Sequence, residues 1–103
     1  MPQQTEHTRY DKVISGEIQG SATAAQMPDI SCRAVTFKAL SGNVGNVYIG
    51  GPGVTVPDGT TDTTSGVEMQ PGDWLQFTPC SNISLFYYIC DNAGDDFGYL
   101  VML

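Results

Sequence analysis

Acidic and hydroxyl side chains in two loop-like stretches are the first candidates for chemistry. The first stretch contains Asp58, Thr60 and Asp62, and the second, 91–96, contains three further aspartates. Calcium takes oxygen ligands of this kind, but the EF-hand spacing and its terminal Glu are missing from the first stretch. We therefore expect solvated loop tips without a metal, and we take Asp58, Thr60 and Asp62 as candidate contact residues of an exposed loop.

Catalysis by a nucleophile and a base is not expected from this sequence. The chain has one histidine, His7, near its N-terminus, so neither a Ser-His-Asp arrangement nor a histidine-based metal site can be assembled within one chain. Pairs of aspartates could in principle serve glycoside hydrolysis, but a chain of 103 residues leaves little room for a sugar cleft. We expect a protein that is not an enzyme and has no cofactor.

Trp74 is the leading candidate for a binding contact. It alternates with apolar residues that would fill the core, so it would face outward, although partial cover by a loop is an equal alternative. With Tyr48, Tyr87 and Tyr88 it could form a stacking platform for sugar rings. A carbohydrate-binding module is therefore one alternative function.

The three cysteines Cys32, Cys80 and Cys90 lie in or beside strand-like runs. Their odd number argues against the disulfide framework of a secreted protein. We expect three reduced thiols packed in the interior, because free cysteine is among the most buried residue types.

The charge of the chain limits its partners. Eleven acidic residues against four basic ones give a net charge of -7, so the sequence offers no electrostatic source for binding nucleic acid. The longest apolar run, 83–90, is too short to span a bilayer, and the N-terminus lacks a basic stretch followed by an apolar one. We expect a soluble protein that has no signal peptide and does not contact a membrane.

Alternating apolar and polar residues divide the chain into short strands, and these strands must position the candidate binding residues. The pattern predicts an edge strand within 11–19 and a loop at 20–29, followed by strands at 31–40 and 44–49 that pair as a hairpin. It then predicts strands at 67–69 and 75–77, joined by a tight turn at 70–73, and a central strand at 83–90. The last strand, at 97–103, is expected to be either internal or part of a subunit interface. About seven to eight such strands predict an all-β, antiparallel, jelly-roll-like sandwich. We expect one domain, 13–103, preceded by a flexible N-terminal arm, 1–12.

The middle third of the chain resembles small virion accessory proteins of tailed bacteriophages, in which a V-Y-I-G-G-x-G-V segment precedes an L-x-P-G-[DE]-x-L-x-L turn. The matching positions are Val47, Tyr48, Ile49, Gly50, Gly51, Gly53, Val54, Met69, Pro71, Gly72, Asp73, Leu75 and Phe77. The resemblance implies a capsid decoration (cement) protein or a small tail or fibre component, in a family that is compact, β-rich, often trimeric and equipped with a terminal arm. Cupins share the P-G-D turn, but their metal site needs several histidines.

The resemblance also implies partners and a location. We expect two partners, the major capsid protein and other copies of this chain, which would form a homotrimer. The protein would be made in the host cytoplasm and would lie on the capsid surface of the virion. In the arm, Arg9, Tyr10 and Lys12 are the candidate capsid contacts, although only two of them are basic and no family contact residue maps onto them. The candidate contacts between subunits are Tyr88, Tyr99, Leu100, Met102 and Leu103.

Overall fold

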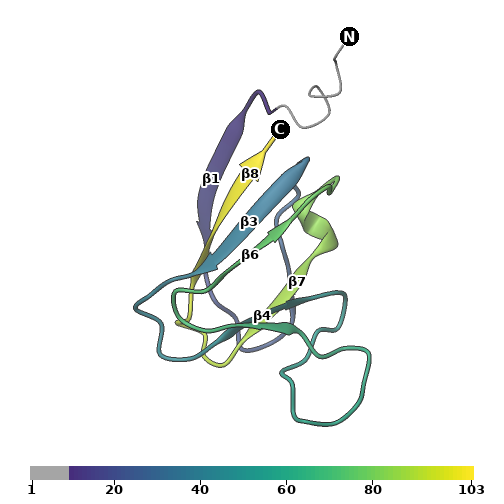
Figure 1. Cartoon of the computed structure of the whole chain (residues 1–103). Coiled ribbons are helices and arrows are strands. Elements are labelled where there is room, and N and C mark those ends of the chain that lie inside the picture. Colours follow the sequence, from purple (N-terminus) through teal and green to yellow (C-terminus); the bar gives the residue numbers. More distant parts are fainter. Residues whose placement is uncertain (1–9) are drawn as a thin grey trace.

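The computed structural model describes residues 10–103, which form two antiparallel four-stranded sheets packed against each other (Figure 1). In spatial order, sheet I consists of β1 (Val13–Ile18), β8 (Phe97–Met102), β3 (Ala34–Ala39) and β6 (Trp74–Phe77). Sheet II consists of β2 (Ala25–Gln26), β7 (Tyr87–Cys90), β4 (Val47–Gly50) and β5 (Val67–Met69). The expectation of an all-β antiparallel sandwich is confirmed.

The strand pairing shows that the chain is folded back on itself around the β4–β5 connection. β4 pairs with β5, β3 with β6, β2 with β7 and β1 with β8, all antiparallel. Further pairing of β3 with β8 and of β4 with β7 joins these pairs into the two four-stranded sheets. Except between β4 and β5, each connection along the chain passes from one sheet to the other.

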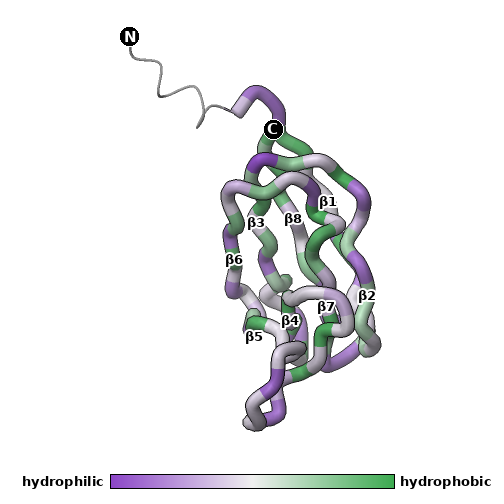
Figure 2. Tube along the Cα trace, turned by 90° about the vertical axis from the view of Figure 1, so that its right-hand side faces the viewer, coloured by the Kyte–Doolittle hydropathy of each residue, from purple (hydrophilic) through white to green (hydrophobic). Residues whose placement is uncertain are grey.

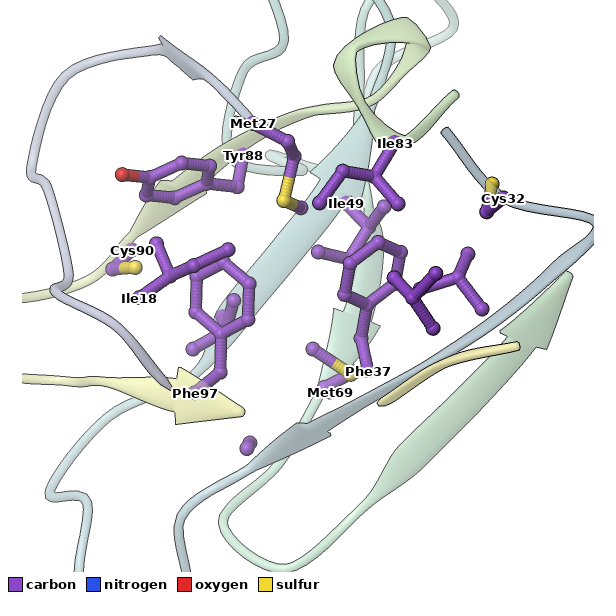
Figure 3. Packing of buried hydrophobic residues seen from close by; sticks show 14 residues of the cluster. Ile18, Met27, Cys32, Phe37, Ile49, Met69, Ile83, Tyr88, Cys90 and Phe97 are labelled. Atoms are coloured by element: carbon purple, nitrogen blue, oxygen red, sulfur yellow. The ribbon is translucent and has the colours of Figure 1, made fainter. Parts of the chain in front are cut away.

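The core lies between the inner faces of the two sheets (Figure 3). On β3, Val35, Phe37 and Ala39 are fully buried, as their alternation in the sequence predicts. Phe37 contacts Phe97 of β8 edge to face, with ring centroids 6.2 Å apart. Rigid strands therefore display on their outer faces the residues that lie between these buried ones.

The predicted hairpin between 31–40 and 44–49 is wrong, because β3 belongs to sheet I and β4 to sheet II. The segment between them is held against the β7–β8 loop instead. The Asn43 side chain donates to the Asp96 carbonyl at 2.7 Å, and the Asp96 N–H donates to Asn43 Oδ1 at 3.1 Å. These bonds across the sequence turn the chain from one layer to the other.

The expectation for 83–90 is correct only in its second half. Residues Ile83–Leu85 form the 3-10 helix η2, where the Asn82 side chain accepts a hydrogen bond from the Ser84 N–H at 2.9 Å. β7 then runs between β2 and β4 as an inner strand. The tight turn at 70–73 is confirmed by the bond from the Asp73 N–H to the Gln70 carbonyl at 2.8 Å, but it joins strands of different sheets.

Both ends of the described chain lie at the same end of the body (Figure 2). The N–H groups of Asp11 and Lys12 donate to the Leu103 carbonyl, and the Leu103 N–H donates to the Lys12 carbonyl at 2.8 Å. The β1·β8 ribbon therefore extends to Asp11. β1 is an edge strand, as predicted, and β8 is an inner strand, which is one of the two alternatives expected for 97–103. Of the predicted arm, residues 1–9 lie outside the described part.

Candidate functional site

An apolar groove opens between the edge strands β5 and β6. The two strands leave the tight turn at 70–73 and enter different sheets, so they diverge away from it. The groove encloses about 320 Å³ and is lined by Ile49, Gly50, Gly51, Val67, Phe77, Leu85 and Phe86. A volume of this size is at the lower end of the range for ligand pockets.

The rim of the groove leaves apolar surface in water. Val67 of β5 is 56% exposed and Leu85 of η2 is 59% exposed. In the described sheets β5 pairs only with β4, and β6 only with β3, so each leaves one strand edge open. The groove thus combines an apolar floor with backbone groups that an extended segment of another chain can pair with.

The loop 51–66 begins at Gly51, which lines the groove, and projects from the lower end of the sandwich (Figure 1). Val54 anchors the loop: it is 2% exposed and packs where Gly50 and Gly66 lack side chains, since a Cβ at Gly50 would lie 2.7 Å from Val54 Cγ2. Two backbone bonds of 2.9 Å, from Thr55 to Thr64 and from Gly66 to Thr55, close the base of the loop.

The predicted contact residues Asp58, Thr60 and Asp62 are exposed in this loop. Asp58 Oδ1 accepts from the Thr60 N–H at 3.0 Å and from Thr60 Oγ1 at 2.6 Å. Asp62 Oδ1 accepts from the N–H groups of Thr64 and Ser65 at 2.9 and 2.7 Å. These hydrogen bonds lower the pKa of both carboxyl groups. Within residues 10–103, no cluster of His, Cys, Asp and Glu could hold a metal.

The second acidic stretch differs from the solvated loop that we expected. Asp95 is only 2% exposed. Its Oδ1 accepts from the N–H groups of Val44 and Gly45 at 3.0 and 3.1 Å, and its Oδ2 accepts from the Asn92 N–H at 3.1 Å and from Asn92 Nδ2 at 2.9 Å. Desolvation acts to raise the pKa of Asp95, but these hydrogen bonds outweigh it and lower the pKa. Asp95 is thus a structural anchor.

The structure separates the residues predicted to contact other subunits. Tyr88 is 8% exposed; its ring packs on Phe97 with centroids 4.9 Å apart, and its hydroxyl donates to the Gln19 carbonyl at 3.2 Å. It offers almost no surface to a partner, and burial raises its pKa. Tyr99 and Leu103 pack partly buried against the core. Leu100 and Met102 alternate with buried Val101, so these two lie on the outer face of sheet I.

Two of the three candidate capsid contacts, Tyr10 and Lys12, belong to the described residues and lie beside the C-terminus. Tyr10 is 39% exposed and Lys12 is exposed, whereas Arg9 lies outside the described residues. The structure brings a further cation to this end, because the Arg33 N–H donates to the Met102 carbonyl at 2.9 Å on the strand next to Leu103. No sequence pattern indicated this neighbour, because its position depends on the pairing of β3 with β8.

Trp74 is 61% exposed, so the expected outward orientation is confirmed. The four-residue aromatic platform, which the sequence left open as an alternative, does not form. Tyr48 is 5% exposed and its hydroxyl donates to Asp91 Oδ1 at 3.1 Å, and burial is the main cause of its raised pKa. Tyr88 points into the core, and Tyr87 belongs to sheet II, whereas Trp74 belongs to sheet I. Trp74 is the most exposed of the four side chains.

The expectation of three free thiols is also wrong, because Cys32 and Cys80 form a disulfide with Cα atoms 6.0 Å apart. The pairing of β3 with β6 continues beyond the strands: the Cys80 N–H donates to the Arg33 carbonyl at 2.9 Å and the Cys32 N–H to the Ser81 carbonyl at 3.0 Å. Residues 48 positions apart are thereby brought within bonding reach. Cys90 is buried and outside the disulfide, and burial is the main cause of its raised pKa.

Comparison with known proteins gives no family for this chain. The sequence matches no protein-family model and no curated protein. Within residues 10–103 there is no helix long and apolar enough to cross a membrane.

Proposed function

We propose that this chain is a non-enzymatic structural protein of a tailed-phage virion, which decorates the assembled capsid and stabilises it by binding between capsomers. The observation that carries the proposal is the apolar groove between β5 and β6, with Val67 and Leu85 exposed at its rim. A contiguous apolar hollow of this kind is typical of a surface that a partner covers.

The residues behind the phage resemblance support this choice of partner. Ile49, Gly50, Gly51 and Phe77 belong to the matching segments, and the same four residues line the groove. The resemblance therefore coincides with the candidate docking surface as well as with the backbone turns that shape it.

The strand order supports the finer fold that we propose, a jelly roll. Pairing of first with last, second with seventh, third with sixth and fourth with fifth strand is what a long folded-over ribbon rolled into two sheets produces. Jelly-roll sandwiches are common in viral capsid proteins.

The proposed mechanism needs no chemistry. An extended segment of the capsid protein would pair with the open edge of β5 or β6 and place an apolar side chain in the groove. A ligand that binds the assembled shell and not the separated capsomers stabilises the shell by mass action. The residues Arg9, Tyr10 and Lys12 would form a second contact, and other copies of the chain, as a trimer on the virion surface, would add a third through Met102 at the C-terminal end of β8.

Co-sedimentation with expanded capsids of the phage that encodes this chain tests the proposal. We expect the wild-type protein to sediment with capsids and Leu85→Asp to bind at least about tenfold more weakly, because a carboxylate would have to be desolvated in the groove. Val44→Asp is a matched control, since it adds the same charge at a residue that is 91% exposed in the 40–46 segment.

Three outcomes would count against the proposal. Absence of co-sedimentation at every salt concentration removes the decoration function, and binding to isolated tails instead supports a tail or fibre component. Full binding by Leu85→Asp removes the groove from the interface. For the trimer, light scattering at micromolar concentration should give three times the monomer mass of 11.0 kDa, and a clean monomer contradicts it.

A further inference from the structure

The outer face of sheet I carries a row of four aligned residues, one from each strand. The strand register places Glu17 opposite Gly98, Gly98 opposite Lys38, and Lys38 opposite Trp74. Adjacent strands are about 4.8 Å apart, so the row extends about 14 Å across the sheet. It faces away from the core, because the neighbouring residues along the strands are the ones that pack inside.

Trp74 at one end of the row is an aromatic platform on a rigid support. Its side chain is 61% exposed, while Leu75 and Phe77 on the same strand pack against the core. An indole ring in this position loses little conformational entropy when a ligand binds, and its apolar surface is available to a flat ligand.

Gly98 leaves a gap in the row between a carboxylate and an ammonium group. A Cβ added at Gly98 would meet only the Gly16 carbonyl oxygen at 3.5 Å, an ordinary contact, and the φ angle of Gly98 is not positive. Neither packing nor backbone conformation therefore requires glycine here. The absence of a side chain at Gly98 leaves the backbone uncovered between Glu17 and Lys38.

The polar groups of this face are available for a ligand. The next row consists of Ser15, Leu100, Thr36 and Gln76. Among the described residues, no hydrogen bond or ion pair engages the side chains of Glu17, Lys38 or Gln76. Carboxylate, ammonium and amide groups beside an aromatic ring are the groups that hold the hydroxyls and the apolar ring face of a sugar.

The charge of the face indicates which kind of sugar it fits. The two rows contain one acid and one base, whereas the whole chain carries -7. An acidic polysaccharide would be repelled by the rest of the molecule, and a cationic ligand would be drawn to other surfaces. An uncharged ligand suits this locally neutral face.

We propose that the outer face of sheet I is a binding site for a neutral oligosaccharide. One sugar ring stacks on Trp74, and the chain continues across the sheet so that a following ring lies over Gly98, where Lys38 and Glu17 bind its hydroxyl groups. This function is independent of capsid binding, because the groove between β5 and β6 lies elsewhere and shares no residue with the row.

A glycan array of neutral oligosaccharides, followed by calorimetric titration of the hits, tests the site in the full chain. We expect Trp74→Ala to weaken binding at least about tenfold. Gly98→Val fills the gap with a residue suited to a strand, so it should weaken binding of the longer oligosaccharides and leave the shortest ligand that binds Trp74 unaffected. Unchanged melting temperatures would show that both variants are folded.

The two proposals fail separately. Leu85→Asp should lose capsid binding and keep sugar binding, and Trp74→Ala should do the reverse. No reproducible hit on the array overturns the sugar site, and so does a hit whose affinity is unchanged in both Trp74→Ala and Gly98→Val.

Discussion

The two acidic loops, 51–66 and 91–96, contain similar residues and have different roles. In 51–66, Asp58 and Asp62 bond only to residues within three positions along the chain, and both are exposed. In 91–96, Asp95 is buried and bonds to Val44 and Gly45, which lie 51 and 50 positions away. The pKa of all three carboxyl groups is lowered, but among these three only Asp95 connects separate parts of the fold.

This difference shows that the donors around a carboxylate decide its role. Exposed loop carboxylates find their partners locally, as Asx-type turns do, so their removal disturbs only the turn. A buried carboxylate leaves several N–H groups without partners when it is lost, and each unsatisfied buried donor is costly. The predictions that follow vary the strength of these two kinds of anchoring.

Removing the disulfide should have the largest effect on stability. The loss of this covalent link gives a reference value against which the loss of each carboxylate can be compared. With cysteines 48 positions apart, loss of the crosslink in Cys32→Ser/Cys80→Ser should lower the free energy of unfolding by about 4 kcal/mol on the chain-entropy estimate. Chemical denaturation measures it, with Cys90→Ser as the control for loss of a buried sulfur. Equal stability of the double variant and wild type would contradict the crosslink.

Asp95→Asn should have the next largest effect, about 3 kcal/mol. The amide keeps the shape of the side chain but turns one of its oxygens into a donor that faces backbone N–H groups. Denaturation curves would measure the loss. Asp58→Asn, in the exposed loop, is the matched control and should leave the curve unchanged.

The stabilising effect of Asp95 should also depend on pH. Its pKa is lower in the folded chain than its ordinary value of 3.8, so the folded state takes up this proton less readily than the unfolded state. The contribution is complete above the unfolded value and disappears as the pH falls through the folded-state pKa. Melting temperatures measured from pH 6 down to about pH 2 should therefore fall more steeply for wild type than for Asp95→Asn. Parallel curves would contradict the role of Asp95.

Val54→Ala should loosen the exposed loop at a smaller cost, about 1.5 kcal/mol for the buried methyl groups removed. Hydrogen exchange should become faster for the Thr55 and Gly66 amides, which close the base of the loop, and remain unchanged in β3. Uniform acceleration across the whole sandwich would instead place Val54 in the global core.

Asp62→Ala should have the smallest effect, with no change in melting temperature because the carboxylate is exposed and serves only its own turn. Limited proteolysis within 58–65 should become faster, since the Thr64 and Ser65 amides lose their acceptor. A melting temperature lowered as much as in Asp95→Asn would abolish the distinction between the two loops.

Much of the fold was predictable because it depends on local alternation. The inward positions of Val35 and Phe37 follow from period-two alternation, and the turn at 70–73 follows from turn chemistry. The apolar composition of 97–103 left two alternatives, an inner strand or a subunit interface, and in the structure β8 is an inner strand. Strand partners were harder to predict, because an apolar strand can pair with any other, and the expected 31–40/44–49 hairpin was wrong for this reason.

The candidate sites were predictable in their residue types and not in their grouping. Alternation alone indicated that Trp74 faces outward, but its neighbours Lys38 and Gly98 come from strands far away in the sequence. The groove depends on β5 and β6 entering different sheets, which no local signal reports. The glycine at position 45 is in retrospect consistent with the role of Asp95, because a Cβ at Gly45 would lie 2.8 Å from Asp95 Oδ2.

The sequence by itself determined that this chain is a β-protein with exposed loops and an outward-facing Trp74, since period-two alternation and turn residues act within a few positions. The tertiary structure alone decided that Cys32 bonds to Cys80, that Asp95 is an anchor, and that Trp74 shares a row with Glu17. Each of these depends on which strands pair, and pairing is chosen by how the whole chain buries its apolar faces.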